Sequence, residues 1–435
     1  MRIQDHIGKI TWTVLDKGLF ITYGIIRMLQ VSRMQPSEFG LFALLDALVL
    51  TIGTLSDNFS LQSIIRFGSD NFLRPKINAL SMISHTGLSM GLALIIFLSK
   101  THLSILFSEP RLIQVATYLP LLCLLNLPRI MSVKFLLRDT KMKEVFITNS
   151  IWFGSMIAVT FYLLSIHEEL SLLDMIWITG IGTSLSSLTG LFFTFSSIDL
   201  EIPDKDAIHQ FYRFGGYQVS WALPSTIMKQ LDLYFVQYFF GATIVGIFQS
   251  AKTLFRFFEA LIDGIGGLYY PAMVRIHARN DKEAEKSLTS KMLSFSICSI
   301  LVLVIMMNAG IGEWAVHTFL STKYSLAFGH FQWLMISAIA LPMNTMAIVY
   351  IIYDDMPALL FNSIISCLAG ITASVLIGIV HAESMVSFGT IFYNVSFAIF
   401  GIRFAIHKQV FTLKDFFRAI PDIFHFAKSG LKKYK

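Results

Sequence analysis

Long apolar stretches alternate with short polar segments along the whole chain. Each apolar stretch runs for about 18 to 25 residues, the length that an α-helix needs to cross the hydrocarbon core of a bilayer. The pattern predicts twelve transmembrane helices, at residues 11–31, 39–60, 78–99, 112–133, 145–166, 172–195, 214–240, 244–270, 292–312, 331–353, 358–380 and 385–406. The first and the eighth of these stretches contain charged residues, which need an explanation of their own.

The composition agrees with an all-α integral membrane protein. Hydrophobic residues make up 54% of the 435 residues and charged residues only 14%, and the mean hydropathy is +0.65. A soluble domain carries about 25% charged residues, so this chain has too little polar surface to cover a water-soluble body. Cys123, Cys298 and Cys367 lie inside apolar stretches without metal-ligand spacing. We therefore expect no metal site and no other cofactor.

Lysine and arginine in the connecting segments predict the orientation of the helices. With the N-terminus in the cytoplasm, 24 of these residues fall in cytoplasmic segments, and only Arg33, Lys100, Arg111 and Lys323 fall outside. Both termini are therefore expected in the cytoplasm. Membrane insertion and anionic lipid headgroups account for the net charge of +6, so we expect no nucleic-acid partner.

Two stretches near the starts of the second and eighth predicted helices are similar. A shift of 206 residues aligns FGLFALLDALV (39–49) with VGIFQSAKTLF (245–255), and it pairs Gly40 with Gly246. The two helices are six apart, so both halves share an orientation, as in transporters built from parallel repeats. We expect two six-helix lobes related by a pseudo-twofold repeat, at 1–200 and 201–406, and a basic amphipathic tail at 407–435 that lies on the cytoplasmic leaflet.

The stretch AKTLFRFFEALIDG (251–264) places a polar stripe on one face of the eighth predicted helix. Lys252, Arg256, Glu259 and Asp263 are spaced by four, three and four residues, within a sector roughly 60° wide on a helix. A charge at the bilayer centre costs about 2.5–3.5 kcal/mol, so these side chains are expected to face a polar cavity. The alternative is a set of structural ion pairs at the lobe interface.

Other charged and polar side chains fall inside the first, second and seventh predicted helices. They are Asp16, Lys17, Tyr23, Arg27, Asp46, Asp57, Lys229 and Asp232. Together with the stripe they mark the helix pairs that the repeat relates, which indicates a cavity between two lobes. We expect Arg129 to extend toward the membrane surface, and His85 to be a hydrogen-bonded structural histidine.

Two segments carry a resemblance to a known family. MQPSEFGLFALLDALVLTIG (34–53) is followed by Arg66 at the end of the second predicted helix. RFGGYQVSWALPSTIMKQLDLYFVQYFFGATIVGIFQSAKTLF (213–255) contains Asp232, an FFG turn and VGIF, and it is followed by Pro271. Both segments resemble the Wzx-type polysaccharide flippases, whose superfamily also holds multidrug and toxin extrusion antiporters and the lipid II flippase. The family's usual Val-Gly-Tyr is replaced here by VGIF.

The resemblance implies a transporter and not an enzyme. The implied substrate is an undecaprenyl-pyrophosphate-linked oligosaccharide, such as an O-antigen or a capsular or exopolysaccharide repeat unit. It would pass from the cytoplasmic to the periplasmic leaflet of a bacterial inner membrane by alternating access, driven by an H+ or Na+ gradient. Membrane lipids and other membrane proteins of polysaccharide assembly are the expected partners.

A pyrophosphate that crosses the hydrocarbon core needs fixed cations on its route. The residues expected to bind the substrate are Lys17, Tyr23, Arg27, Arg66, Lys252 and Arg256. The residues expected to carry the coupling ion are Asp16, Asp46, Asp57, Asp232, Glu259 and Asp263. Two other functions stay open: a drug or cation antiporter of the same fold, which would favour an anionic, aromatic cavity, and a glycan polymerase or ligase. A polymerase or ligase usually has a large periplasmic loop, whereas the outside connections predicted here reach only about twenty residues.

Overall fold

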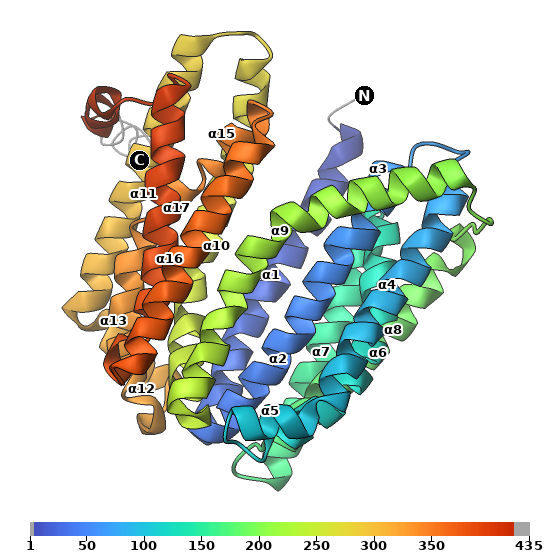
Figure 1. Ribbon diagram of the computed structural model, residues 1–435, viewed down its shortest axis with the longest axis vertical. Helices are drawn as coiled ribbons and strands as arrows, with labels where there is room; N and C mark the ends of the chain where they lie inside the picture. Colours follow the sequence, from blue (N-terminus) through green and yellow to red (C-terminus); the bar gives the residue numbers. More distant parts are fainter. Residues whose placement is uncertain (1–3, 422–435) are drawn as a thin grey trace. The chain divides into compact units, whose positions relative to one another are not determined.

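The computed structural model describes residues 4–421, apart from several side chains at the start of α1 and in the middle of α9. These residues form helices and their connecting turns, with one isolated bridge between Met34 and Leu170. The chain divides into two compact units, Met1–Gln249 and Ser250–Lys435 (Figure 1). The fold is all-α, as the sequence predicts.

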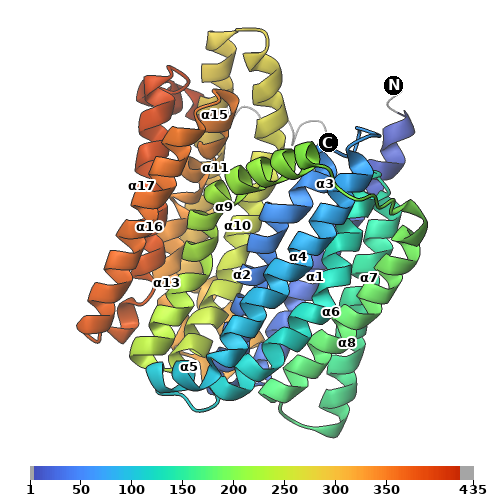
Figure 2. The same ribbon diagram turned by 45° about the vertical axis from the view of Figure 1, so that its right-hand side comes forward.

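The first unit is a bundle whose long helices run alongside one another (Figures 1 and 2). Its core includes Leu61, Leu127 and Phe135, through which α6 packs on the segment that follows α2. Its elements are α1 (Gln4–Ser32), α2 (Pro36–Ser56), the π-helix η1 (Asp57–Leu61), α3 (Gln62–Arg66), α4 (Arg74–Leu98), α5 (Lys100–Leu106), α6 (Leu112–Arg138), α7 (Met142–Ile166), α8 (Leu172–Thr194), the 3-10 helix η2 (Phe195–Ser197), α9 (Lys205–Phe240) and the first turns of α10 (Ala242–His277).

The second unit begins within α10. Its core includes Met273, Leu293 and Met346, which join α10, α11 and the segment between α14 and α15. Its further elements are α11 (Lys282–Met306), the π-helix η3 (Met307–Ile311), α12 (Gly312–Leu320), η4 (Thr322–Tyr324), α13 (Ala327–Ala338), α14 (Leu341–Asn344), α15 (Ala347–Ile352), α16 (Met356–Ile379), η5 (Glu383–Met385), α17 (Phe388–His407) and a helix over residues 413–421. The rest of the predicted tail, residues 422–435, lies outside the described residues.

All twelve stretches predicted to cross the membrane fall on helices. Among the described residues, eight helices are long and apolar enough to span a bilayer, and a ninth span is the pair Ala327–Ala338 and Leu341–Ile352, which is bent by 47°. The bend lies next to Pro342, in the first turn of α14, where the proline has no N–H for the helix ladder. The other three predicted stretches lie on α1, α9 and α10, which are 29, 36 and 36 residues long.

The boundary between the units lies at residue 249, inside α10. The sequence instead places a lobe boundary at residue 200, at the polar segment that precedes α9. The helix α9 belongs to the first unit because it packs against α2, α4 and η1. The extent of the two predicted lobes stays a prediction.

The glycines that the sequence repeat aligns lie against each other. A Cβ atom on Gly40 would be 1.9 Å from the carbonyl oxygen of Ala242, and a Cβ on Gly246 would be 1.9 Å from the carbonyl oxygen of Pro36. Pro36 and Ala242 are the first residues of α2 and α10, and the same shift of 206 relates them. The contact is therefore reciprocal, and it brings the two backbones as close as glycine allows.

The turns that follow α6 and α15 have the same geometry. Between α6 and α7, Thr140 has φ 53°, and the amide of Lys141 donates to the carbonyl of Leu136 at 2.9 Å. Between α15 and α16, Asp354 has φ 53°, and the amide of Asp355 donates to the carbonyl of Tyr350 at 2.9 Å. The same helix-ending turn, with one residue in the left-handed region, thus occurs at corresponding places in the two halves.

The two ends of the first unit hold the segments that the charge pattern assigns to opposite sides. At one end Arg111 pairs with Glu38 at 3.1 Å, and the amide of Leu170 donates to the carbonyl of Arg33 at 2.7 Å. At the other end Arg74 pairs with Asp199 at 3.3 Å. This grouping fits alternate crossings, while the side that faces the cytoplasm stays a prediction.

Candidate functional site

The helices α1 and α2 hold an ion pair within their apolar length. Nη2 of Arg27 lies 3.5 Å from Oδ2 of Asp46, and its guanidinium lies 4.4 Å from the centre of the Phe42 ring. The side chain of Arg27 is 15% exposed and that of Asp46 32%. The long N–O distance and the partial exposure describe a loose pair that a stronger anion can compete with.

Tyr23 and Gln30 flank this pair on α1. The Tyr23 ring stacks on Phe153 of α7, with ring centres 4.7 Å apart. Its hydroxyl is buried beside Arg27 and Gln30 and makes no hydrogen bond of normal geometry within residues 4–421. Gln30 donates to the hydroxyl of Thr160 at 2.7 Å and so fixes α1 to α7. The structure therefore brings together three of the predicted site residues: Tyr23, Arg27 and Asp46.

A second polar group joins α1, α6 and α7. Nδ2 of Asn149 donates to Oδ1 of Asp16 at 2.8 Å, and Nη2 of Arg129 donates to Oδ1 of Asn149 at 3.0 Å. The Arg129 guanidinium lies 3.4 Å from the centre of the Trp152 ring. Asn149 is buried, with 4% of its surface exposed.

The prediction for Arg129 was wrong. Asn149 and Trp152 lie seven and ten residues from the start of α7, and Arg129 lies nine residues from the end of α6. The Arg129 guanidinium therefore stays at about the depth of its own backbone in α6. There the amide of Asn149 and the Trp152 ring take the place of the water that it would otherwise reach at the membrane surface. Arg129 is a candidate site residue that the sequence analysis set aside.

Asp57 begins the π-helix η1, and one oxygen of its carboxylate, Oδ2, makes two contacts. Oδ2 of Asp57 lies 3.0 Å from Nζ of Lys134 and accepts a hydrogen bond from Gln62 at 3.1 Å. A π-helix within an α-helical span often marks a functional position. In this structure it places the Asp57 carboxylate against α6, which favours a structural ion pair at this predicted ion-coupling position.

His85 lies near this pair, on α4. It is fully buried, and neither ring nitrogen makes a hydrogen bond of normal geometry among the described residues. It borders a cavity of about 10 Å³ together with Ser89, Cys123 and Asn126, a volume that holds about one water molecule. The backbone of Ser56 lies within reach of the ring, and the hydrogen-bonded histidine stays a prediction.

Three further predicted site residues of the first unit lie on α1, α3 and α9. Lys17 is exposed, with Nζ 5.7 Å from the centre of the Phe20 ring, and Arg66 is exposed at the end of α3. Asp232 is buried in α9 and accepts a hydrogen bond from the amide of Leu233 at 2.8 Å.

The polar stripe lies on α10, which is one continuous helix. Arg256 and Asp263 are exposed, and Lys252 and Glu259 are half-buried. This pattern agrees with a face that is polar along its length. The choice between a substrate path and structural pairing for these four residues stays a prediction.

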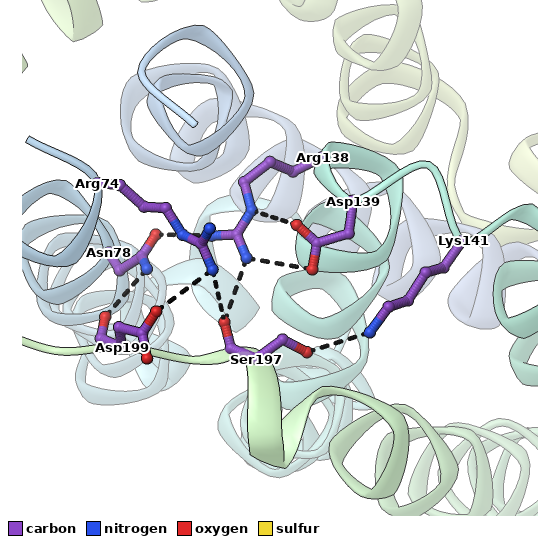
Figure 3. Close-up of polar contacts among 7 residues, drawn as sticks. All are labelled: Arg74, Asn78, Arg138, Asp139, Lys141, Ser197 and Asp199. Carbon is purple, nitrogen blue, oxygen red and sulfur yellow. Dashed lines mark hydrogen bonds and ion pairs between the residues drawn. The ribbon is translucent and has the colours of Figure 1, made fainter. Parts of the chain in front are cut away.

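An extensive polar cluster at one end of the first unit escaped the sequence analysis. Nη2 of Arg74 and Nη2 of Arg138 both donate to the carbonyl oxygen of Ser197, at 3.4 and 3.2 Å. Asn78 accepts from Arg138 at 3.2 Å and donates to the carbonyl of Asp199 at 3.0 Å. Figure 3 shows these side chains converging on the segment between α8 and α9.

The same end fixes the start of α9. Nζ of Lys76 lies 2.7 Å from Oδ2 of Asp204, whose Oδ1 accepts from the amide of Ala207 at 2.8 Å and caps α9. The hydrogen bond from Lys76 holds the pKa of the Asp204 carboxyl below its usual range. The polar segment at the predicted lobe boundary is therefore bound to the first unit.

Comparisons with known proteins agree with this architecture. The model of the family described as polysaccharide biosynthesis protein matches residues 31–329, more than half of the chain. No curated protein matches. An inward-facing multidrug resistance MATE family transporter of the MOP superfamily is 13% identical, with a TM-score of 0.73 over 89% of this chain and 94% of that one.

Two further solved structures share the fold. The lipid II flippase MurJ, in an inward closed conformation, is 13% identical, with a TM-score of 0.76 over 94% of this chain and 90% of that one. A MOP superfamily transporter from Pyrococcus furiosus is 14% identical, with a TM-score of 0.59 over 92% and 94% of the two chains. This multi-pass membrane protein has the fold of MOP superfamily transporters and belongs to the polysaccharide biosynthesis protein family.

Proposed function

We propose that this protein flips an undecaprenyl-pyrophosphate-linked oligosaccharide from the cytoplasmic to the periplasmic leaflet of a bacterial inner membrane. The observation that carries the proposal is the half-buried guanidinium of Arg27, loosely paired with Asp46, in a polysaccharide biosynthesis protein with a transporter fold. A cation inside the apolar length of a helix is costly, and it marks a route for an anion.

Arg27 can exchange one anion for another. A pyrophosphate offers more charge and more acceptor oxygens than a single carboxylate, and guanidinium binds such groups with two parallel hydrogen bonds. When the pyrophosphate arrives, it displaces Asp46 from Arg27. Arg256 and Lys252 on α10 then provide further cations along the path.

The same exchange supplies coupling to an ion gradient. A proton or Na+ that binds the Asp46 carboxylate neutralises it and weakens its attraction for Arg27, which becomes available to the substrate. When the ion leaves, the restored carboxylate competes again for Arg27 and weakens its hold on the pyrophosphate, which helps the substrate to leave. The lipid tail stays in the bilayer, both termini face the cytoplasm, and membrane proteins of polysaccharide assembly receive the product.

Export complementation with substituted proteins tests the proposal. Arg27→Ala and Arg256→Ala should abolish polysaccharide export at a normal membrane protein level, while Arg256→Lys should keep a fraction of it because Lys makes only one part of the bidentate contact. Arg279→Ala removes an exposed arginine beyond the end of α10 and serves as the matched control. Normal export from both alanine variants would refute the proposed substrate path.

A drug or cation antiporter is the second candidate, because MATE family transporters share the fold. Such a protein would protect cells against cationic dyes, and Arg27→Ala would leave that protection intact or improve it, since Arg27 repels cations. Dye resistance without any effect on polysaccharide export would favour the antiporter.

A further inference from the structure

An apolar groove lies in the second unit, at the end where α17 meets the C-terminal helix. It has a volume of about 390 Å³ and is bordered by α11, α14, α17 and residues 411–416. Leu293, Ile297, Ile402, Ile406 and Phe416 form its walls. Ile406 is 45% exposed, so the groove opens at the surface of the second unit and not into its core.

One wall of the groove is the C-terminal helix, residues 413–421, which is fixed to α11. Nζ of Lys286 lies 3.0 Å from Oδ2 of Asp415, and the hydroxyl of Ser294 donates to the carbonyl of Phe416 at 2.8 Å. Thr412 caps the helix through its hydrogen bonds with Asp415. Figure 1 shows this short dark red helix beside α11 and α17. The groove is thus built from several fixed elements.

The C-terminal helix separates two kinds of surface. Leu413 and Phe416 face the apolar groove, whereas Asp415 and Arg418 border a polar hollow of about 230 Å³ that also touches Lys286. A helix with one apolar and one charged face lies at the boundary between hydrocarbon and headgroups. The groove is therefore at the depth where an acyl chain meets its headgroup.

Arg403 is the charged residue in the wall of the groove. Its side chain is exposed, and it has no carboxylate partner among residues 4–421. A guanidinium at the edge of an apolar groove, near the headgroup region, suits a phosphate. The ligand that fits is an amphiphile with a hydrocarbon chain and an anionic phosphate.

We infer that this groove binds one acyl chain of an anionic phospholipid, with its phosphate on Arg403. If a methylene takes roughly the 30 Å³ of a water molecule in the liquid, 390 Å³ holds about 13 methylenes. That length matches most of one acyl chain, whereas the much longer polyprenyl chain of the proposed substrate would leave most of its length outside. The site is independent of the transported molecule.

Lipids that stay with the full-length protein through purification in mild detergent test the inference. The wild-type protein, reloaded from vesicles of phosphatidylglycerol or phosphatidylcholine, should retain about one phosphatidylglycerol and little phosphatidylcholine, measured by native mass spectrometry. Arg403→Gln should weaken phosphatidylglycerol binding by about tenfold, because it removes a charge-assisted hydrogen bond. Lys414→Gln removes a cation of the same segment outside the groove wall, and it should bind as the wild type does.

A second variant tests the groove itself. Ile402→Trp fills the cavity and should abolish retention of either lipid, with the thermal stability of the purified protein as the check on folding. If Ile402→Trp does not fold, Arg403→Gln alone decides whether the inference holds, because Arg403 is exposed and its replacement should not disturb folding. Equal phosphatidylglycerol retention by Arg403→Gln and Lys414→Gln would overturn the inference. Selective retention of a polyprenyl phosphate would overturn it as well and assign the groove to the substrate's tail.

Discussion

A methyl group added to Gly40 should force α2 and α10 apart. Its carbon would lie 1.9 Å from the carbonyl oxygen of Ala242 and 2.9 Å from the amide nitrogen of Gly246. Both obstructing atoms belong to the backbone of α10, so no side-chain rotation relieves the clash. Gly91 in α4 is the matched control, because a Cβ there meets nothing within 4 Å.

The magnitude follows from two opposing effects. Replacing a glycine by alanine inside a helix stabilises the fold by about 0.5–1 kcal/mol, and overpacking costs about 1–3 kcal/mol. Because the clash is with backbone, we expect Gly40→Ala to lower the free energy of unfolding by about 2 kcal/mol. Gly91→Ala should raise it by about 0.5–1 kcal/mol.

Thermal unfolding of the purified protein in detergent measures the difference. At about 2–4 °C per kcal/mol, Gly40→Ala should melt several degrees below the wild type and Gly91→Ala slightly above it. Gly246→Ala should behave as Gly40→Ala does, because its Cβ would meet Pro36 in the same way.

The double variant is the sharper test. Once one alanine has separated the helices, the second meets less resistance, so the Gly40→Ala/Gly246→Ala loss should fall well short of the sum of the single losses. Equal melting temperatures for Gly40→Ala and Gly91→Ala would refute the close approach of α2 and α10. A double-variant loss equal to the sum of the two single losses would refute the idea that both glycines serve one shared helix contact.

Three further predictions concern polar contacts and topology. Arg129→Ala should lower the free energy of unfolding by about 1–3 kcal/mol, because Asn149 loses its charged donor; thermal unfolding would show it, and unchanged stability would place Arg129 outside the network. The pKa of Asp204 is lowered by the hydrogen bond from Lys76, so the folded state binds its proton less readily than the unfolded state, and the stabilisation present at neutral pH is lost as the pH falls below about 4. The protection of the amides at the start of α9 against hydrogen exchange, taken relative to the intrinsic exchange rate at each pH, should therefore fall in acid in the wild type and much less so in Asp204→Asn, whereas an equal fall in both would exclude this carboxyl. Cysteines at Leu103 and Thr322 should react with an impermeant reagent from the periplasm and cysteines at Thr140 and Asn280 should not; labelling of position 280 from outside would invert the topology.

The hydrophobic pattern was sufficient to locate every long helix but not to describe its interior. An 18-residue apolar stretch predicts a span from transfer free energy alone, which does not depend on neighbouring helices. The π-helix at Asp57–Leu61 packs against α4 and α6, and the sequence of these five residues does not predict it.

The polar residues show the same division. The sequence placed Asp16, Tyr23 and Arg27 within the first predicted helix, because the apolar pattern that defines a helix is local. Their partners come from distant segments: Asp46 from α2 and Asn149 from α7. Arg129 was expected to extend toward the membrane surface because the sequence indicates that a buried charge is costly. The sequence does not show that the Trp152 ring lies beside the guanidinium and offsets that cost.

The contact between Gly40 and Gly246 also bears on how the chain arose. Residue 40 of one repeat meets the backbone of the other, and its equivalent does the same in return, which is the arrangement of an isologous interface in a twofold homodimer. In an ancestor of half this length, one glycine codon would have supplied both sides of the contact, and any mutation there would have introduced two clashes at once. After a duplication and fusion each codon would mutate alone, yet a larger side chain at either position would still separate the helices by itself.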